Sequence, residues 1–391
     1  MSDKVKLQFG TSYREVEVGE IINLAVDEPL RLDCGVEISD FPFAYQTHGT
    51  LNEDKSNAIL ICHGLTGDQY ILDDHPVTKK EGWWKSIVGS GKPIDIDKYF
   101  IICPNVLGGC MGSLGPKNIN IETGEPYNLD FPIITIGDMV DAQKLLVESF
   151  GIEKLFSVIG GSMGGMHVLE WAASYPQMIC SAIPIATAPR HTAQNIAFHE
   201  IGRQSIMVDP EWAGGSYINE KKFPANGLAV ARMTAHVTYL SENGLQRKFG
   251  RELQDRDKIS YGFEADFQIE SYLRYQGASF VERFDPNSYL YITRAMDYFD
   301  LAADHGGELR NAFKDNDASF CVISFSSDWL FSTSESKHIV RALSSTSSDV
   351  SFVEIESDKG HDAFLLDEPI FYNTLDGFIK KVARKIGLER C

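Results

Sequence analysis

The sequence Gly160-Gly161-Ser162-Met163-Gly164 follows directly after an apolar run, 155–159, and directly precedes a helix-like segment, 165–175. A G-x-S-x-G pattern between a strand and a helix is typical of a tight turn that lifts a serine hydroxyl above the edge of a sheet. Glycines flank this serine because neighbouring Cβ atoms would collide with the strained turn or with the adjacent helix. We therefore predict that Ser162 is a nucleophile.

Short apolar runs surround this turn, and most of them are bounded by glycine, proline or asparagine. Unbroken runs of this kind are typical of strands buried on both faces of a parallel sheet. A helical spacing of apolar residues covers 139–150, where we expect Asp138 to cap the start and Gly151 the end. The expected strands are residues 43–47, 58–62, 99–103, 155–159 and 182–186.

The character of the sequence changes after Pro189. Residues 191–305 are polar and helix-like and contain no convincing buried strand, whereas strand-like runs return at 320–325 and 350–355 and precede a final helix-like segment, 369–386. We predict an α/β fold with a mostly parallel central sheet, built from residues 1–190 and 306–391. Residues 191–305 are predicted to form an inserted helical layer.

Length and charge limit the function classes. The chain has 391 residues, 43% of them hydrophobic, which is enough for one large core or two smaller ones. Its 36 basic and 55 acidic residues give a net charge of -19, so no nucleic-acid partner is expected. The N-terminus shows no signal-peptide pattern, and no run reaches the ~18 apolar residues of a membrane span. We therefore expect a soluble, cytoplasmic protein with no membrane partner.

A serine nucleophile needs a base, and the base needs an acid that fixes its tautomer and stabilises its cation. In a fold of this kind the chain order is serine, then acid, then histidine. Asp328 follows the expected strand 320–325, and His361 follows the next strand. Because the carboxyl ends of parallel strands share one edge of the sheet, we expect both side chains to lie near Ser162. Asp358 and Asp367 are the alternative acids, but neither follows the preceding strand.

The tetrahedral intermediate also needs backbone N–H donors for its oxyanion. Met163 comes directly after the nucleophile and should supply one donor. The second should come from the loop after an early strand, and His63-Gly64-Leu65-Thr66-Gly67 has that position, with Leu65 as the candidate donor. His63 itself is interpreted as structural, because no aspartate is placed to orient it.

Patterns for metals and bound cofactors are incomplete. Residues 91–93 lack the serine or threonine of a phosphate loop, and residues 108–112 do not match the dinucleotide fingerprint. Arg203 stands where a zinc-binding helix starting at His199 would place its second histidine. We predict no metal site and no bound cofactor, and histidines such as His191 receive no catalytic role.

These features predict acyl transfer through a serine ester, and they leave open whether water or another alcohol accepts the acyl group. At this point the sequence resembles the homoserine O-acetyltransferase family of the methionine pathway, over nearly the whole chain. The matching segments are 160–166, 169–172, 175–176, 63–68, 108–110, 123–127, 231–233, 239–241, 246–250 and 287–291.

The resemblance implies an α/β-hydrolase fold with a helical lid, and a homodimer joined through the lids. It also implies that Ser162 takes an acetyl group from the co-substrate acetyl-CoA and passes it to the hydroxyl of L-homoserine in a ping-pong cycle. His361 would act as the base and Asp328 would orient it. Arg232 would pair with the carboxylate of homoserine, and Asp362 with its ammonium group; a zwitterion needs one charge partner for each end.

The acyl donor is a finer question, because relatives of this family use either acetyl or succinyl groups. The family pattern for succinyl users has an arginine two residues after the triad aspartate, and Leu330 stands there in this chain. A buried succinyl carboxylate needs a nearby cation, so Leu330 favours acetyl. The alternatives are a homoserine O-succinyltransferase, a serine esterase of the same fold, or a catalytically silent binding protein.

Overall fold

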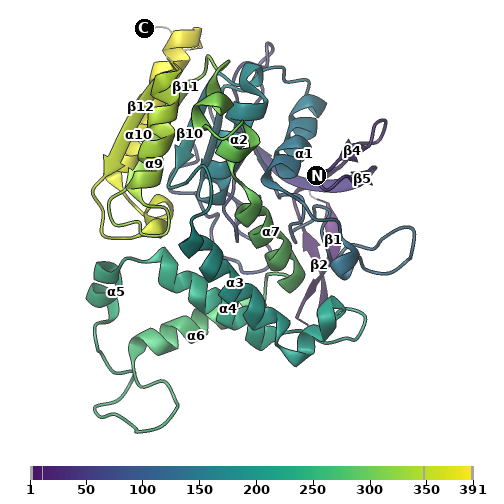
Figure 1. Cartoon of the computed structure of the whole chain (residues 1–391), viewed down its shortest axis with the longest axis vertical. Coiled ribbons are helices and arrows are strands. Elements are labelled where there is room, and N and C mark those ends of the chain that lie inside the picture. The colour runs from purple at the N-terminus through teal and green to yellow at the C-terminus, as the bar shows by residue number, and fades with distance from the viewer. Residues whose placement is uncertain (1–2, 11, 347, 389–391) are drawn as a thin grey trace.

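An eight-stranded sheet forms the centre of the molecule, in the strand order β12-β11-β10-β9-β7-β8-β6-β3 (Figure 1). The computed structural model describes residues 3–10, 12–346 and 348–388, so the ends of the predicted core segments, residues 1–2 and 389–391, lie outside it. Two further pairs of strands, β1 with β2 and β4 with β5, form small separate sheets. The strands are β1 (Lys4–Phe9), β2 (Ser12–Glu17), β3 (Glu20–Leu24), β4 (Leu30–Arg31), β5 (Glu37–Ile38), β6 (Phe41–His48), β7 (Ala58–Cys62), β8 (Phe100–Pro104), β9 (Ser157–Gly161), β10 (Ser181–Ile185), β11 (Ser319–Phe325) and β12 (Asp349–Ile355).

The sheet is mostly parallel, as predicted. Every neighbouring pair from β12 to β8 is parallel, and only the two pairs that β6 makes at the far edge, with β8 and with β3, are antiparallel. The expected strand 43–47 is therefore real as part of β6, but it pairs antiparallel with β8. The strand before Ser162 lies two residues later than expected, because β9 includes Gly160 and Gly161.

Alternate residues of each central strand face opposite layers of helices. In β7, Leu60 belongs to the core under α1, α2 and α9, whereas Ile59 and Ile61 belong to the core under α10. Both sets are fully buried, which explains why the strand reads as an unbroken apolar run. These layers are formed by α1 (Ile136–Ser149), α2 (Met163–Ser174), α9 (Thr333–Ser345) and α10 (Pro369–Ile386).

A group of helices is inserted between β10 and β11, and in this fully described stretch no residue belongs to a named strand. In Figure 1, α3 to α6 gather at one end of the molecule, beyond the sheet, while α7 runs back along it. The helix α3 packs on α4, and α4 packs on α6. These helices are α3 (Ala193–Met207), α4 (Ala225–Tyr239), α5 (Glu242–Phe249), α6 (Gln268–Val281), α7 (Pro286–Tyr298) and α8 (Leu301–Asp304).

The helix α1 begins differently from the prediction. Thr135 is the N-cap, and Asp138 completes a reciprocal capping box by accepting the backbone N–H of Thr135. The prediction that Asp138 itself caps the helix is therefore wrong. The residue that caps it is Thr135, three positions earlier. Gly151, with φ of 66°, follows the last turn as expected. Within the described residues, no helix is both long and apolar enough to cross a membrane.

Candidate active site

Ser162 lies at the turn between β9 and α2 and has backbone angles of φ 60° and ψ -125°. A non-glycine residue in this region is strained, and such strain is held where the surrounding structure requires it. Here the helix packs so closely on the sheet that a Cβ on Gly164 would collide with the carbonyl of Cys62, and a Cβ on Gly160 with the carbonyl of Gly164. The glycines of the motif therefore allow the turn that places the serine at the sheet edge.

His361 and Asp328 are brought together by the ends of β12 and β11. His361 Nδ1 lies 2.7 Å from Asp328 Oδ2, and both residues are buried, at 2% and 4% exposure. The other carboxylate oxygen of Asp328 accepts the backbone N–H groups of Leu330 and Phe331. The carboxylate is thus held by the backbone of its own loop and holds one side of the imidazole, leaving Nε2 for the reaction.

The surroundings of His361 favour its protonated form. Burial lowers the pKa of His361, but the charge and hydrogen bond of Asp328 and the charge of Asp362 raise it, and the net pKa lies above the ordinary value of 6.5. A base with a raised pKa takes a proton from a hydroxyl more readily. The arrangement can therefore perform general base catalysis.

Ser162 and His361 line the same cavity, which has a volume of about 180 Å³. Residues from the sheet edge and from the inserted helices enclose it together. The lining residues are Gly64, Leu65, Thr66, Gly67, Trp83, Ser162, Arg232, Tyr239, Arg283, His361, Asp362, Phe364 and Leu365. The serine and imidazole predicted from the sequence thus share one solvent-accessible space.

The two predicted oxyanion donors also lie here. Leu65 lines the cavity, and Met163 is the first residue of α2, where a helix leaves its backbone N–H groups without intrahelical partners. Within the described part of the chain, neither N–H has a hydrogen-bond acceptor. Both are available to a developing negative charge. His63, by contrast, contacts the carbonyl of Gly64 and accepts the N–H of Val106, as expected of a structural residue.

Arg232 and Asp362 lie in the same cavity as Ser162. Arg232 Nη1 donates to the hydroxyl of Thr66 over 2.9 Å. Burial raises the pKa of Asp362 to about 6, although the charges of His361 and Arg232 act in the opposite direction. The same cavity therefore offers a cation and a titratable carboxylate together with His361.

A second, smaller cavity of about 30 Å³ also reaches Ser162. Leu330 is part of its wall, as are Leu65 and Phe331. The described residues that line it include no lysine, no arginine and no carboxylate. An ester on Ser162 would thus adjoin two spaces: the cavity that contains Arg232 and Asp362, and a small one whose wall, within the described chain, includes His191 and His199 but no lysine or arginine.

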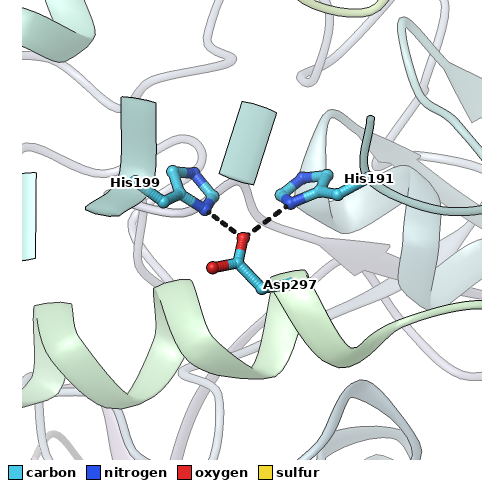
Figure 2. Close-up of side chains that lie close together, drawn as sticks. All are labelled: His191, His199 and Asp297. Carbon is cyan, nitrogen blue, oxygen red and sulfur yellow. Dashed lines mark hydrogen bonds and ion pairs between the residues drawn. The ribbon is translucent and has the colours of Figure 1, made fainter. Parts of the chain in front are cut away.

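His191 and His199 bind one carboxylate, as Figure 2 shows: their Nδ1 atoms lie 3.1 Å and 2.9 Å from Asp297 Oδ1. These side chains offer ligand atoms within 4.8 Å of one another, a spacing that a metal ion could use. However, Arg203 Nη1 lies 2.7 Å from the second oxygen of Asp297. A metal would have to share this carboxylate with a guanidinium group, so we interpret the cluster as a buried ion-pair network. Sequence reasoning missed it, because its members lie about one hundred positions apart.

Among the cavity residues to which the sequence reasoning assigned no role, three carry polar groups suited to substrate contacts: Thr66, Tyr239 and Arg283. Thr66 lies in the loop predicted to carry the oxyanion donor, and this position could have marked it as a residue of the site. Tyr239 and Arg283 come from the inserted helical region, where no local pattern marks a residue as facing the sheet.

Comparison with known proteins gives a consistent set of relatives. A family model described as the alpha/beta hydrolase fold matches residues 57–368. The chain is 62% identical to homoserine O-acetyltransferase of Rhodospirillum rubrum over 95% of both chains. It is also 62% identical to homoserine O-acetyltransferase of Caulobacter vibrioides, over 93% of this chain and 95% of that one.

Solved structures resemble the chain across its length. The crystal structure of homoserine O-acetyltransferase from Bacillus anthracis has a TM-score of 0.83 and 28% identity, over 92% of this chain and 96% of that chain. The crystal structure of esterase E22 has a TM-score of 0.82 and 29% identity, over 92% of this chain and 99% of that chain. One architecture therefore carries both acyl transfer and ester hydrolysis among these neighbours.

Proposed function

Since the chain belongs to the homoserine O-acetyltransferase family of the α/β-hydrolase fold, we propose that it transfers acetyl from acetyl-CoA to the hydroxyl of L-homoserine through an ester on Ser162. The observation that supports this route is the shared cavity of Ser162 and His361 beside a charge pair suited to an amino acid. The reaction is a step of methionine biosynthesis. We place it in the cytoplasm.

In the first half of the cycle, His361 Nε2 takes the proton of Ser162 as its Oγ attacks the thioester carbon. The carbonyl oxygen becomes an oxyanion, which the N–H groups of Leu65 and Met163 stabilise. Removing one such donor typically costs about 3 to 4 kcal/mol of barrier. The intermediate collapses, the carbon–sulfur bond breaks, and the imidazolium returns its proton to the departing CoA thiolate. Asp328 keeps the imidazole in the required tautomer throughout.

In the second half, the hydroxyl of homoserine attacks the acetyl-enzyme. His361 takes the hydroxyl proton, the bond between the acetyl carbon and Ser162 Oγ breaks, and the proton passes to the serine. Arg232 binds the carboxylate of the amino acid and Asp362 binds its ammonium group, which fixes the hydroxyl next to the ester. The small cavity beside Leu330 receives the acetyl methyl group, and the described residues of its wall include no lysine or arginine to pair with a succinyl carboxylate.

Residues 191–305 act as a lid domain on a core formed by residues 1–190 and 306–391. The support is that Arg232 and Tyr239 of α4 line the same cavity as Ser162. Water is the competing acceptor and is far more concentrated than homoserine. Transfer prevails because the lid keeps water from the ester while the bound amino acid is held in position to attack.

The decisive experiment compares acetyl-CoA and succinyl-CoA, each with and without L-homoserine, by following release of free CoA. We expect continuous release, beyond the single CoA per enzyme that forming acetyl-Ser162 frees, only with acetyl-CoA and homoserine together, and an about 10⁴-fold or greater loss of rate in Ser162→Ala, as is typical of triad nucleophiles. Equal release with L-serine would contradict the assignment of homoserine as acceptor. Preference for succinyl-CoA would instead indicate a homoserine O-succinyltransferase.

A second candidate, hydrolysis of acetyl esters, is supported by the likeness to esterase E22. It uses the same serine ester but needs no amino acid. Hydrolysis of p-nitrophenyl acetate at a rate that homoserine does not increase would favour this candidate. A homoserine-dependent increase in product release would favour transfer.

A further inference from the structure

Two arginines of the inserted helical region contact the same loop at the sheet edge. Arg232, in α4, donates Nη1 to the hydroxyl of Thr66, and Arg283, between α6 and α7, donates Nη1 to the carbonyl of Thr66. Both hydrogen bonds are 2.9 Å long. The two guanidinium groups also lie near one ring, at 4.8 Å and 5.3 Å from the centroid of Phe280. The two cations are therefore neighbours.

Neither cation has a carboxylate partner. Among residues 3–10, 12–346 and 348–388, no carboxylate oxygen lies within 4.0 Å of the nitrogens of Arg232 or Arg283. The charge of Asp68 acts on Arg283, but Asp68 Oδ2 is bound by His75 at 3.0 Å. The charge of Asp362 acts on Arg232, and we have assigned this carboxylate to the ammonium group of the substrate.

The pair is unusual for this molecule, whose net charge is -19. Arg203, for comparison, is buried and paired with Asp297. Arg232 and Arg283 are both half-buried, and two adjacent cations that are partly removed from water cost free energy unless an anion joins them. The pair thus has the character of an anion site that is completed by a ligand.

The location of the pair indicates which ligand it serves. Arg232 and Arg283 both line the cavity of about 180 Å³ that contains Ser162 and His361. Both also line an adjoining cavity of about 330 Å³. A ligand whose anionic group lies between the two guanidinium groups would therefore extend into the cavity that contains Ser162.

We propose that Arg283 is a second binding residue for the carboxylate of the amino acid acceptor, which lies between the guanidinium groups of Arg232 and Arg283. This inference rests on the proposed function and adds a residue to it. The bond from Arg283 to the carbonyl of Thr66 fixes the guanidinium plane and leaves other N–H donors for the carboxylate. With two arginines at the carboxylate and Asp362 at the ammonium group, the hydroxyl of the acceptor has a defined direction toward the ester.

The experiment compares the wild-type enzyme with Arg283→Met, using L-homoserine and 3-aminopropan-1-ol as acceptors. The second compound is homoserine without its carboxylate. For Arg283→Met we expect kcat/KM for homoserine to fall about 10-fold to 100-fold, the loss of a charged hydrogen bond. We expect kcat/KM for 3-aminopropan-1-ol to stay within about 3-fold, because this acceptor has no group for Arg283 to bind. Formation of acetyl-Ser162 from acetyl-CoA, measured by mass spectrometry before acceptor is added, should keep its rate.

Arg274→Met is the matched control. Arg274 is an exposed arginine of α6 that also donates to a backbone carbonyl, that of Phe263, and it does not line the cavity. Its substitution should leave both acceptors unaffected. Arg283→Lys is the second variant, for the case in which Arg283→Met does not fold. It keeps the charge but loses the planar fork, and it should also lose activity selectively with homoserine.

The outcomes separate the possible roles of Arg283. Equal losses with both acceptors, or slower formation of acetyl-Ser162, would mean that Arg283 acts by holding the Thr66 loop, and this would overturn the proposal. Unchanged kinetics with homoserine in Arg283→Lys and Arg283→Met would overturn it as well. Continuous turnover of acetyl-CoA by the wild-type enzyme without any amino acid, beyond the single CoA per enzyme that forming acetyl-Ser162 releases, would contradict the proposed function instead, since that result does not involve Arg283.

Discussion

His361 stands between two carboxylates that have different tasks. Asp328 is hydrogen-bonded to Nδ1 and is itself held by backbone N–H groups, whereas Asp362 is the next residue in the chain and faces the cavity. Both raise the pKa of His361. One carboxylate thus orients the base, and the other both tunes the base and is available to a substrate cation.

At the residue scale, we predict a pH dependence that Asp362 controls. Only the neutral imidazole can accept the serine proton, so kcat/KM for acetyl-CoA should fall as the pH drops through the pKa of His361, which lies above 6.5. Asp362→Asn removes a charge that raises this pKa. The acid limb of the profile should therefore move to lower pH, by about half a unit to one unit on the usual scale of such charge effects. The measurement is the rate of acetyl-CoA consumption from pH 5 to pH 9.

Asp358→Asn is the control for this prediction, because Asp358 is close in sequence but pairs with Arg247 at the surface. Its profile should match that of the wild type. A profile that does not move in Asp362→Asn would mean that the two side chains do not interact in the working enzyme.

The catalytic residues could be proposed from sequence because each follows a strand at a position that the chain order requires. Ser162 follows β9 directly, and Asp328 and His361 lie in the loops after β11 and β12; parallel strands bring such positions together. Thr66 and Arg283 could not be paired in this way. Their contact joins residues 217 positions apart through the packing of the inserted helices, and no periodic pattern records it.

At the scale of elements, Asp297 connects three segments. It lies on α7 and binds His199 and Arg203 on α3 together with His191 in the loop after β10 (Figure 2). The side chains of Asp297 and Arg203 are 4% and 3% exposed. The network therefore fastens the first inserted helix to the helix that returns toward the sheet.

We predict that Asp297→Asn destabilises the protein. The change leaves the Arg203 guanidinium buried with only the surface residue Glu200 as a partner, and breaking a buried pair from one side typically costs about 3 to 5 kcal/mol. The midpoint of thermal unfolding should fall clearly. Glu308→Gln, which breaks the exposed pair of Glu308 with Arg310, should shift it little. Similar midpoints for the two variants would show that the network does not stabilise the fold.

The accuracy of the predicted helix and strand bounds depended on how many side chains of each element are buried. The strands β11 and β12 start one residue before the predicted runs, and α10 has the predicted bounds. Each has a clear apolar pattern: a fully buried run in β11, a mainly apolar run in β12, and a helical spacing of buried residues in α10. The first five strands were missed. In β2, for example, nearly every side chain is exposed, so its sequence carries no apolar alternation. The start of α1 was misplaced because a capping box contains two polar residues, and sequence alone did not show which of them is the cap.

At the scale of the whole molecule, a groove in the inserted helices supports the expected homodimer. It has a volume of about 640 Å³, and its wall is rich in apolar side chains. These are Val237, Leu240, Leu245, Phe249, Ile269 and Trp329. Large apolar grooves on one face are typical of protein interfaces.

We predict that the protein is a dimer of its 43.6 kDa chain and that Leu245→Asp separates it into monomers. A charge in an apolar interface must lose its hydration when the chains associate, which weakens association strongly. Sedimentation velocity gives the mass directly. Val26→Asp is the control, since Val26 is 62% exposed and outside the groove. A wild-type protein that sediments as a monomer at micromolar concentration would contradict the prediction.

The two cavities that share Arg232 and Arg283 have a consequence for how the enzyme responds to supply. Thr66, Gly67 and Trp83 also line both, so the space at Ser162 continues into the adjoining one through a single set of walls. If both substrates arrive by that passage, they must take turns. A large excess of the amino acid would then occupy the unacetylated enzyme and delay binding of acetyl-CoA. Turnover would therefore decline at high concentrations of the amino acid, and the enzyme would limit its own rate of product formation.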